Sequence, residues 1–276
     1  MSHIALLRRL APLVAALSAA FAVPAQAQGD LLVAPTRLVV SGGGSTQVVL
    51  SNIGSAPATY RITLEMRRMN TNGEVVDVPE AETNEREKLA LSLVTYAPRR
   101  ITLQPNQPQS VRVSVRPPAD LPDGEYRVHM SFRAIPAATP VTPADAAPAT
   151  GVSIRLTPIY GITIPVIYRK GQTEAGATIA NPRLVTEGKA TLLKLDMTRT
   201  GNRSVFGEIW VLAPGEKDPV FLTRGIAIYP EITQRALSLP VPPAQAALLK
   251  GPMRIEYREP PELGGKVIAS TPANFR

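Results

Sequence analysis

Short runs of alternating apolar and polar residues, separated by glycines and prolines, make up most of this chain. Residues 110–116 read SVRVSVR, the period of two that is typical of a strand with one buried face. Asn72-Gly73 lies between two extended runs, and this dipeptide favours a two-residue hairpin turn. Residues 80–91 differ, because their charges alternate in sign and indicate one short helix or a solvated connection. The pattern predicts an all-β chain whose strand lengths suit β-sandwiches.

The longest extended segment covers residues 151–169, and its even-numbered positions are apolar. Prolines at 158 and 165 each remove a backbone donor and mark the strand as an edge of its sheet. Proteins normally shorten or charge an apolar edge strand, because it is an aggregation hazard. Its presence here favours a surface that pairs with a partner, and the alternative is an internal strand covered on both sides. The face that a partner would bury consists of Val152, Ile154, Leu156 and Tyr160.

The strand pattern divides near Lys170-Gly171, where this long segment ends. We therefore expect one domain in residues 28–170 and a second in residues 171–276. Residues 136–150, just before the long segment, contain almost only Pro, Ala, Thr and Asp and show no periodicity. A stretch of this length without a pattern is long for a loop in a compact domain, so we expect it to be disordered or functional.

Residues 1–27 have the features of a secretory signal peptide. Arg8-Arg9 forms the positive start, residues 10–23 are apolar or small, and Ala25-Gln26-Ala27 has the small-x-small form that signal peptidase reads. The apolar run is short for a membrane span, so an N-terminal membrane anchor is the weaker alternative. We expect cleavage after Ala27 and export, which would change the net charge from +8 to +6.

The composition excludes several kinds of chemistry. The chain has no cysteine and two histidines, of which only His129 would remain after cleavage. Thiol catalysis, disulfides and metal sites built from cysteines or paired histidines are therefore excluded. No nucleophile elbow and no S-x-x-K motif is present, so we expect neither an enzyme nor a cofactor or metal site.

The charge and the aromatic content limit the class of partner. The net positive charge of an exported protein favours carboxylates, anionic lipid or an acidic protein as its binding partner. The 13 aromatic residues are few for base-stacking platforms, so we expect no nucleic-acid binding. A carbohydrate- or peptide-binding module of the cell envelope stays as the alternative function. Such a module needs aromatic rings on an exposed face, and the chain has one tryptophan, Trp210.

A series of short motifs runs in a fixed order through residues 28–170. The motifs are PTRLVV at 35–40, LSN at 50–52 with PATY at 57–60, YAPRRITLQP at 96–105 with QSVRV at 109–113, LPDGEYRVHMSFRAIP at 121–136, and IYR at 167–169. In this order, after a signal peptide, they resemble the PapD-like periplasmic chaperones of the chaperone–usher pilus pathway. The likeness covers nearly the whole mature chain, although the second domain matches only loosely.

The resemblance implies a fold of two immunoglobulin-like sandwiches arranged in an L. It also implies a function in the periplasm. Pilin or fimbrial subunits lack their last strand, and the chaperone's edge strand fills the exposed groove until an outer-membrane usher exchanges it for another subunit's extension. No nucleotide or other cofactor is needed. Self-association of the free chaperone through its edge strand stays open.

The resemblance also assigns roles to particular residues. Arg37, in the first motif, corresponds to the arginine that holds the subunit's C-terminal carboxylate between the domains. Glu125, Arg169 and Glu256 would form a buried polar bridge that holds the domain angle. The family's usual lysine position is Pro165 here, so the second cation stays open, with Lys170 and Arg155 as candidates.

Overall fold

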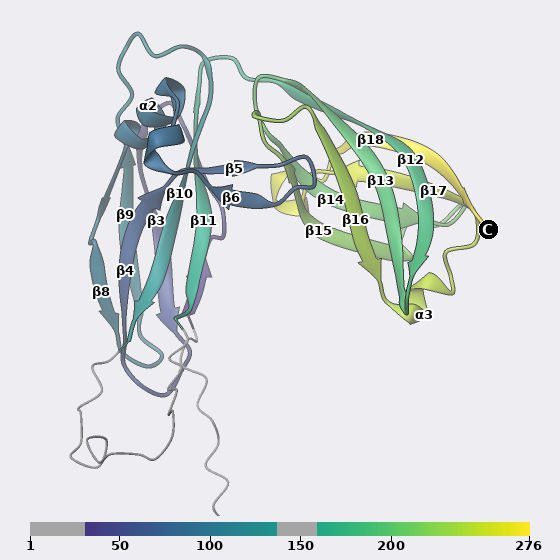
Figure 1. The fold of residues 1–276 in the computed structure, drawn as a ribbon, viewed down its shortest axis with the longest axis horizontal. Coiled ribbons are helices and arrows are strands. Elements are labelled where there is room, and N and C mark those ends of the chain that lie inside the picture. The colour runs from purple at the N-terminus through teal and green to yellow at the C-terminus, as the bar shows by residue number, and fades with distance from the viewer. Residues whose placement is uncertain (1–30, 137–158) are drawn as a thin grey trace, which may run out of the picture.

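The computed structural model describes residues 31–136 and 159–276 (Figure 1). The expected signal peptide, most of the proline- and alanine-rich segment, and Val152, Ile154, Arg155 and Leu156 lie outside these residues. Two β-sandwiches are present, and their long axes meet at a wide angle near one end, in an L (Figure 1). Within the described ranges, no helix is long and apolar enough to cross a membrane.

The first sandwich consists of two facing sheets. One sheet has the order β1 (Leu31–Ala34), β3 (Gly44–Asn52), β9 (Pro108–Val115) and β7 (Val94–Ala97). The other has the order β2 (Leu38–Ser41), β11 (Gly161–Lys170), β10 (Gly124–Ile135), β4 (Ala58–Glu65) and β8 (Arg100–Leu103). The chain changes sheet between β1 and β2, as the first strand of an immunoglobulin-like sandwich can do. The predicted alternation at 110–116 is realised in β9, where Val111, Val113 and Val115 are buried.

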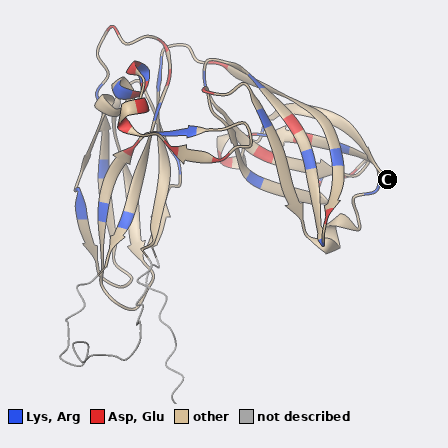
Figure 2. Ribbon diagram, in the orientation of Figure 1, with Lys and Arg blue, Asp and Glu red and all other residues tan. Residues whose placement is uncertain are grey.

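An insertion follows β4. It contains a hairpin of β5 (Arg67–Met69) and β6 (Val75–Asp77), a single 3₁₀ turn (η1, Glu80–Glu82) and the helix α2 (Glu85–Leu93). A hairpin is present as predicted, but its loop covers residues 70–74 and is longer than the expected two-residue turn. The backbone N–H of Gly73 donates to the carbonyl oxygen of Asn70, and of Asn72 and Gly73 only Gly73 has a positive φ, 86°. The short helix begins where Asn84 accepts the backbone N–H of Glu87 and the Glu87 side chain accepts the backbone N–H of Asn84, a capping box. Figure 2 shows acidic and basic residues mixed on α2, with basic residues on the neighbouring β5.

The second sandwich also has two sheets. One has the order β12 (Ala175–Glu187), β13 (Ala190–Gly201) and β16 (Gln234–Val241). The other has the order β15 (Phe221–Ile228), β14 (Val205–Leu212), β17 (Gly251–Arg258) and β18 (Val267–Phe275). One helical turn, α3 (Pro243–Ala246), and a 3₁₀ turn, η3 (Pro261–Leu263), connect strands.

Each sandwich has its own apolar core, and a third apolar cluster joins the two. The first core ends along the chain at Tyr168 and the second begins at Ile179. The third cluster contains Met69 and Ile167 from the first sandwich and Ala227 and Tyr229 from the second. The all-β fold of two sandwiches predicted from the sequence is confirmed. The joining cluster means that the two domains also share buried surface.

Strand β11 is an edge strand over only part of its length. Val166–Arg169 pairs with β2 on one side and with β10 on the other, so this half is internal. Within the described residues, Gly161–Pro165 pairs with β10 alone, and its other side has no partner. The expectation of one continuous edge is therefore wrong for the last four residues of the segment, Val166–Arg169. The chain switch between β1 and β2 is the cause, because it lays β2 beside β11.

Candidate functional site in the interdomain cleft

Arg37 lies between β1 and β2 and reaches from the first sandwich to the second. Its Nη2 donates to Ser204 Oγ at 3.0 Å. The guanidinium carbon lies 4.6 Å from the ring centre of Phe206 and 5.8 Å from that of Tyr229. Both aromatic residues belong to the second sandwich, so the guanidinium is held against the opposite wall of the cleft.

The rest of the Arg37 guanidinium is buried against the second sandwich. Nη1 has no hydrogen bond of good geometry among the described residues, but the Arg37 side chain also hydrogen-bonds to the side chain of Tyr229. Burial lowers the pKa of Arg37, and Tyr229 and Glu125 partly offset this effect by favouring the charged form. A guanidinium stays charged even with a lowered pKa, so Arg37 places a positive charge between the two sandwiches.

Glu125 and Arg169 form an ion pair at the base of the cleft. They are direct neighbours on β10 and β11, and Arg169 Nε lies 3.0 Å from Glu125 Oε2. The same oxygen accepts the backbone N–H of Ser204 at 3.1 Å and the Ser204 hydroxyl at 2.8 Å. The Glu125 side chain has no exposed surface. The cluster therefore connects the two sandwiches, because Ser204 belongs to the second.

Glu256 is not part of this cluster, contrary to the expectation from the sequence. It lies on β17, where Arg254 Nε donates to Oε1 at 2.7 Å and Arg258 Nε donates to Oε2 at 2.5 Å. Its side chain is 7% exposed, so two neighbouring arginines satisfy its charge within the second sandwich. The contact to Glu125 from the second sandwich comes instead from Ser204. Sequence reasoning missed Ser204 because an uncharged residue gives no signal for an ion pair.

The second cation beside Arg37 is not Lys170. Lys170 Nζ donates to the carbonyl oxygen of Ala119 at 2.6 Å, which holds it on a loop of the first sandwich. Arg155 lies outside the described residues. Arg169 Nη2 approaches Ser204 Oγ at 3.5 Å, the same oxygen that accepts from Arg37. Arg169 is therefore the cation that shares a contact with Arg37.

His129 on β10 lies directly opposite Pro165 on β11, at the position where the family's lysine is absent. It is 4% exposed, and its Nδ1 is buried without a partner among the described residues. Burial, followed by the nearby charges of Arg127, Arg67 and Arg37, lowers the pKa of His129 to about 3. His129 is therefore neutral at physiological pH and cannot replace the lysine as a cation.

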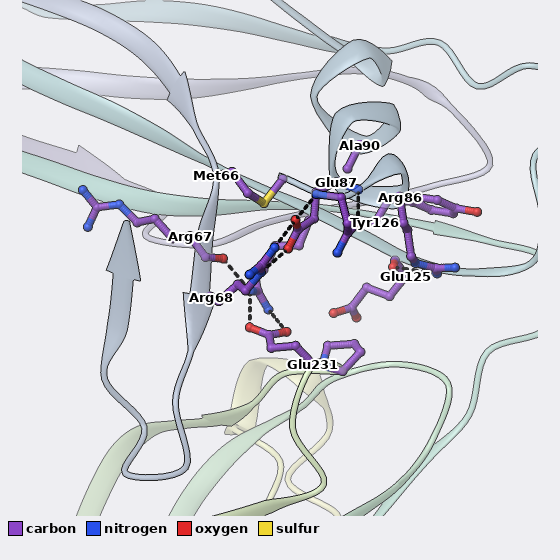
Figure 3. A pocket seen from close by; sticks show the side chains of 12 residues that line it. Met66, Arg67, Arg68, Arg86, Glu87, Ala90, Glu125, Tyr126 and Glu231 are labelled. Carbon is purple, nitrogen blue, oxygen red and sulfur yellow. Dashed lines mark hydrogen bonds and ion pairs between the residues drawn. The ribbon is translucent and has the colours of Figure 1, made fainter. Parts of the chain in front are cut away.

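A pocket of about 240 Å³ opens beside α2, between β5, β10 and the turn at Pro230-Glu231 (Figure 3). Its walls carry mixed charge. Arg86 Nη2 donates to the carbonyl oxygen of Glu125 at 3.1 Å, and its guanidinium carbon lies 4.5 Å from the ring centre of Tyr126. No sequence pattern indicates this pocket, because its walls come from both sandwiches.

Trp210 does not provide an open aromatic platform. The Arg258 guanidinium carbon lies 4.5 Å from its ring centre, and its indole N–H donates to Glu208 at 2.9 Å. Stacking of a sugar on this face would have to displace the arginine. The carbohydrate-binding alternative therefore loses the one tryptophan on which it depended.

No family model and no curated protein matches the chain. Among solved structures, it is similar to the YadV chaperone, at 13% identity, with 89% of this chain and 99% of that chain covered and a TM-score of 0.46. It is similar to the E. coli chaperone DraB, at 14% identity, with 89% and 96% covered and a TM-score of 0.45. It is also similar to a chain of the CsuC–CsuE chaperone–tip adhesion subunit complex from the archaic chaperone–usher Csu pili of Acinetobacter baumannii, at 9% identity, with 90% and 100% covered and a TM-score of 0.45. The fold described above rests on the strand pairing of this chain itself.

Proposed function

We propose that this protein is a periplasmic chaperone for pilus or fimbrial subunits. It binds a subunit by adding its own strand to the subunit's incomplete sheet, and it passes the subunit to an outer-membrane usher. It is not an enzyme, and it uses no cofactor or metal. The observation that carries the proposal is the position of Arg37, which lies between the two sandwiches, directly before the point where β2 begins to pair with β11 and the open part of β11 ends.

The partner's C-terminal carboxylate is the anion that we assign to Arg37. Strand addition alone leaves the register free to slip by two residues, because such a slip presents the same face. A carboxylate bound at one end of the strand fixes the register, and a guanidinium suits it because it donates two parallel hydrogen bonds. Ser204 accepts from Nη2, and the ring of Phe206 lies against the guanidinium, so Arg37 is already oriented, and a bound carboxylate would take the place of the Tyr229 contact.

The donor face is the even-numbered face of residues 152–160. In β11 the even-numbered residues Ile162, Ile164, Val166 and Tyr168 pack into the core of the first sandwich. If the same alternation continues towards residue 152, the side chains that enter the subunit's groove lie on the same face of the strand as the core residues of β11. Tyr160, the described end of the face, is 49% exposed. This exposure supports a surface that a partner covers.

Co-purification from a periplasmic extract tests the proposal. The wild-type chain should bring down small pilin-like subunits, whereas a carbohydrate-binding module would bring down glycan. Ile154→Asp and Leu156→Asp should stay folded and lose the subunits, because a charge cannot enter the apolar groove. The matched controls are Ser153→Asp and Thr157→Asp, on the opposite face. Normal recovery of subunits by both even-face variants would exclude the donor face.

Arg37→Ala tests the anchor separately. Its control is Arg61→Ala, which removes an exposed arginine from β4 in the same sheet. Arg37→Ala should keep the fold and lose its subunits to proteolysis, while Arg61→Ala should behave as the wild type. Wild-type levels of assembled fibres in Arg37→Ala would show that the carboxylate is bound elsewhere.

A further inference from the structure

The β5–β6 hairpin leaves the first sandwich and reaches the second (Figure 1). It is not part of either main sheet, since β5 and β6 pair only with each other. Its contacts fall into three groups, at its root, at its middle and at its tip. Together these contacts join the hairpin to both sandwiches.

The root of the hairpin is fixed to the first sandwich. Arg68 donates from Nε and Nη2 to the two carboxylate oxygens of Glu87 on α2, each at 2.6 Å (Figure 3). Arg68 Nη2 also donates to the carbonyl oxygen of Glu82 at 2.9 Å. The backbone N–H of Val78 donates to Met66 at 2.9 Å and closes the base. A bidentate ion pair with added backbone contacts fixes the direction in which the hairpin leaves the sandwich as well as the position of its root.

The middle of the hairpin is bound to the second sandwich at Glu231. The backbone N–H of Met69 donates to Glu231 Oε1 at 2.7 Å, and Arg127 donates to both oxygens, at 2.5 and 3.1 Å. Arg127 Nη2 also donates to the carbonyl oxygen of Arg67 at 3.0 Å. The Met69 side chain is 5% exposed and packs with Ile167 in the apolar cluster between the sandwiches. One carboxylate of the second sandwich is therefore held by two elements of the first.

The tip of the hairpin lies against β16. The carbonyl oxygen of Thr71 accepts the backbone N–H of Ala236 at 2.8 Å. The Arg235 side chain crosses the turn so closely that a Cβ added at Gly73 would lie 2.1 Å from its Nε. Asn70 Oδ1 accepts the backbone N–H groups of Asn72 and Glu74, each at 3.0 Å, and makes the turn rigid. The positive φ therefore favours glycine at position 73, and a larger residue there would push the Arg235 side chain away from the turn.

We propose that the β5–β6 hairpin is an interdomain strap that sets the angle between the two sandwiches, with Glu231 as the residue that locks it. Domains joined by a short connection move relative to each other unless their interface restrains them. The cluster of Glu125, Arg169 and Ser204 restrains one point near the connection. The strap adds a second point on a different element, and two separate points restrain rotation as well as distance.

The strap also contacts the wall on which Arg37 rests. The Arg127 guanidinium carbon lies 3.6 Å from the ring centre of Tyr229, and Arg37 lies 5.8 Å from the same ring centre. Arg127 is 7% exposed and is held in place by Glu231. Loss of the Glu231 charge would leave this buried guanidinium without its counter-ion and would loosen the hold on Tyr229.

Distance measurements between two spin labels test the strap directly. Because the chain has no cysteine, Gln107→Cys in the first sandwich and Lys217→Cys in the second place the labels without further changes. Both positions are exposed. Double electron–electron resonance on the full mature chain should give one narrow distance distribution. No subunit is involved, so the result does not depend on the proposed function.

Glu231→Gln should broaden this distribution or shift its mean by more than about 2 Å, the scale of a real domain rearrangement. Its control is Glu216→Gln, an exposed carboxylate of the second sandwich, which should leave the distribution unchanged. Gly73→Val is the second variant and acts at the tip without removing a charge. Its control is Gly188→Val, at a turn with φ 60° and no neighbouring atom within 4 Å of an added Cβ.

The comparison of the two glycine variants separates backbone strain from loss of the strap. Gly73→Val should change the distance distribution, and Gly188→Val should not, although both place valine at a positive φ. If Glu231→Gln fails to fold, the Gly73→Val result decides. An unchanged distribution in Gly73→Val and in any folded Glu231→Gln would overturn the proposal.

Discussion

Replacing Glu125 by alanine is expected to destabilise the contact between the sandwiches strongly. Three donors, Arg169 Nε at 3.0 Å, the Ser204 N–H at 3.1 Å and the Ser204 hydroxyl at 2.8 Å, share one oxygen of this side chain. The Glu125 side chain has no exposed surface. Without the carboxylate, the Arg169 guanidinium and the Ser204 N–H lose their acceptor in a place that water reaches poorly.

The magnitude follows from the burial of the two partners. Removing one member of a buried ion pair costs about 3–5 kcal/mol, because the other charge is left unpaired. The Arg169 side chain is 20% exposed, so water restores part of its hydration. We therefore expect Glu125→Ala to lower the free energy of unfolding by about 3 kcal/mol, at the low end of that range. Ser204→Ala removes only the hydroxyl and should cost about 1 kcal/mol.

Urea unfolding at equilibrium, followed by circular dichroism, measures both losses. Each sandwich has its own core, so the unfolding curve is fitted with two transitions where one does not suffice. Glu85→Ala is the control, since the Glu85 side chain is 91% exposed, and its curve should coincide with that of the wild type. A loss below about 1 kcal/mol in Glu125→Ala, the size of an ordinary substitution, would refute the reasoning.

Two further results are expected from the described residues. Asn84→Ala should destabilise the first sandwich by about 1 kcal/mol in the same assay, because it removes the capping box of α2. An unchanged unfolding curve would show that α2 is held by its packing alone. The neutral form of His129 is favoured in the folded protein, where its pKa is about 3, so the unfolded state binds more protons as the pH falls below about 6.5. Stability should therefore decline from pH 6.5 towards pH 3, and this decline should be weaker in His129→Gln; equal slopes in the two proteins would contradict the assignment.

The sequence by itself determined the elements that depend on neighbours along the chain. The period of two at 110–116 became β9, and Asn72-Gly73 correctly located the β5–β6 hairpin, although the loop is longer than two residues. The alternation reports which side of each strand is buried, and the turn dipeptide reports a local backbone conformation. Both depend on residues a few positions apart, so they can be read without knowing the fold.

The contact between Glu125 and Arg169 was expected from a resemblance in the order of motifs, and it is present because the two residues face each other on β10 and β11. Its third member was assigned wrongly. Glu256 was chosen for its charge, but on β17 it has two arginines beside it, and the uncharged Ser204 reaches Glu125 instead.

The tertiary structure alone decided how the two halves of the molecule meet. The pairing of β2 with β11 made the last four residues of the expected edge strand internal, and the hairpin reached the second sandwich at Glu231. These contacts join residues separated by more than a hundred positions, and the side chains involved satisfy no local pattern. Met69, for example, is buried against Ile167 and Tyr229, and only the packing of distant segments brings these residues together.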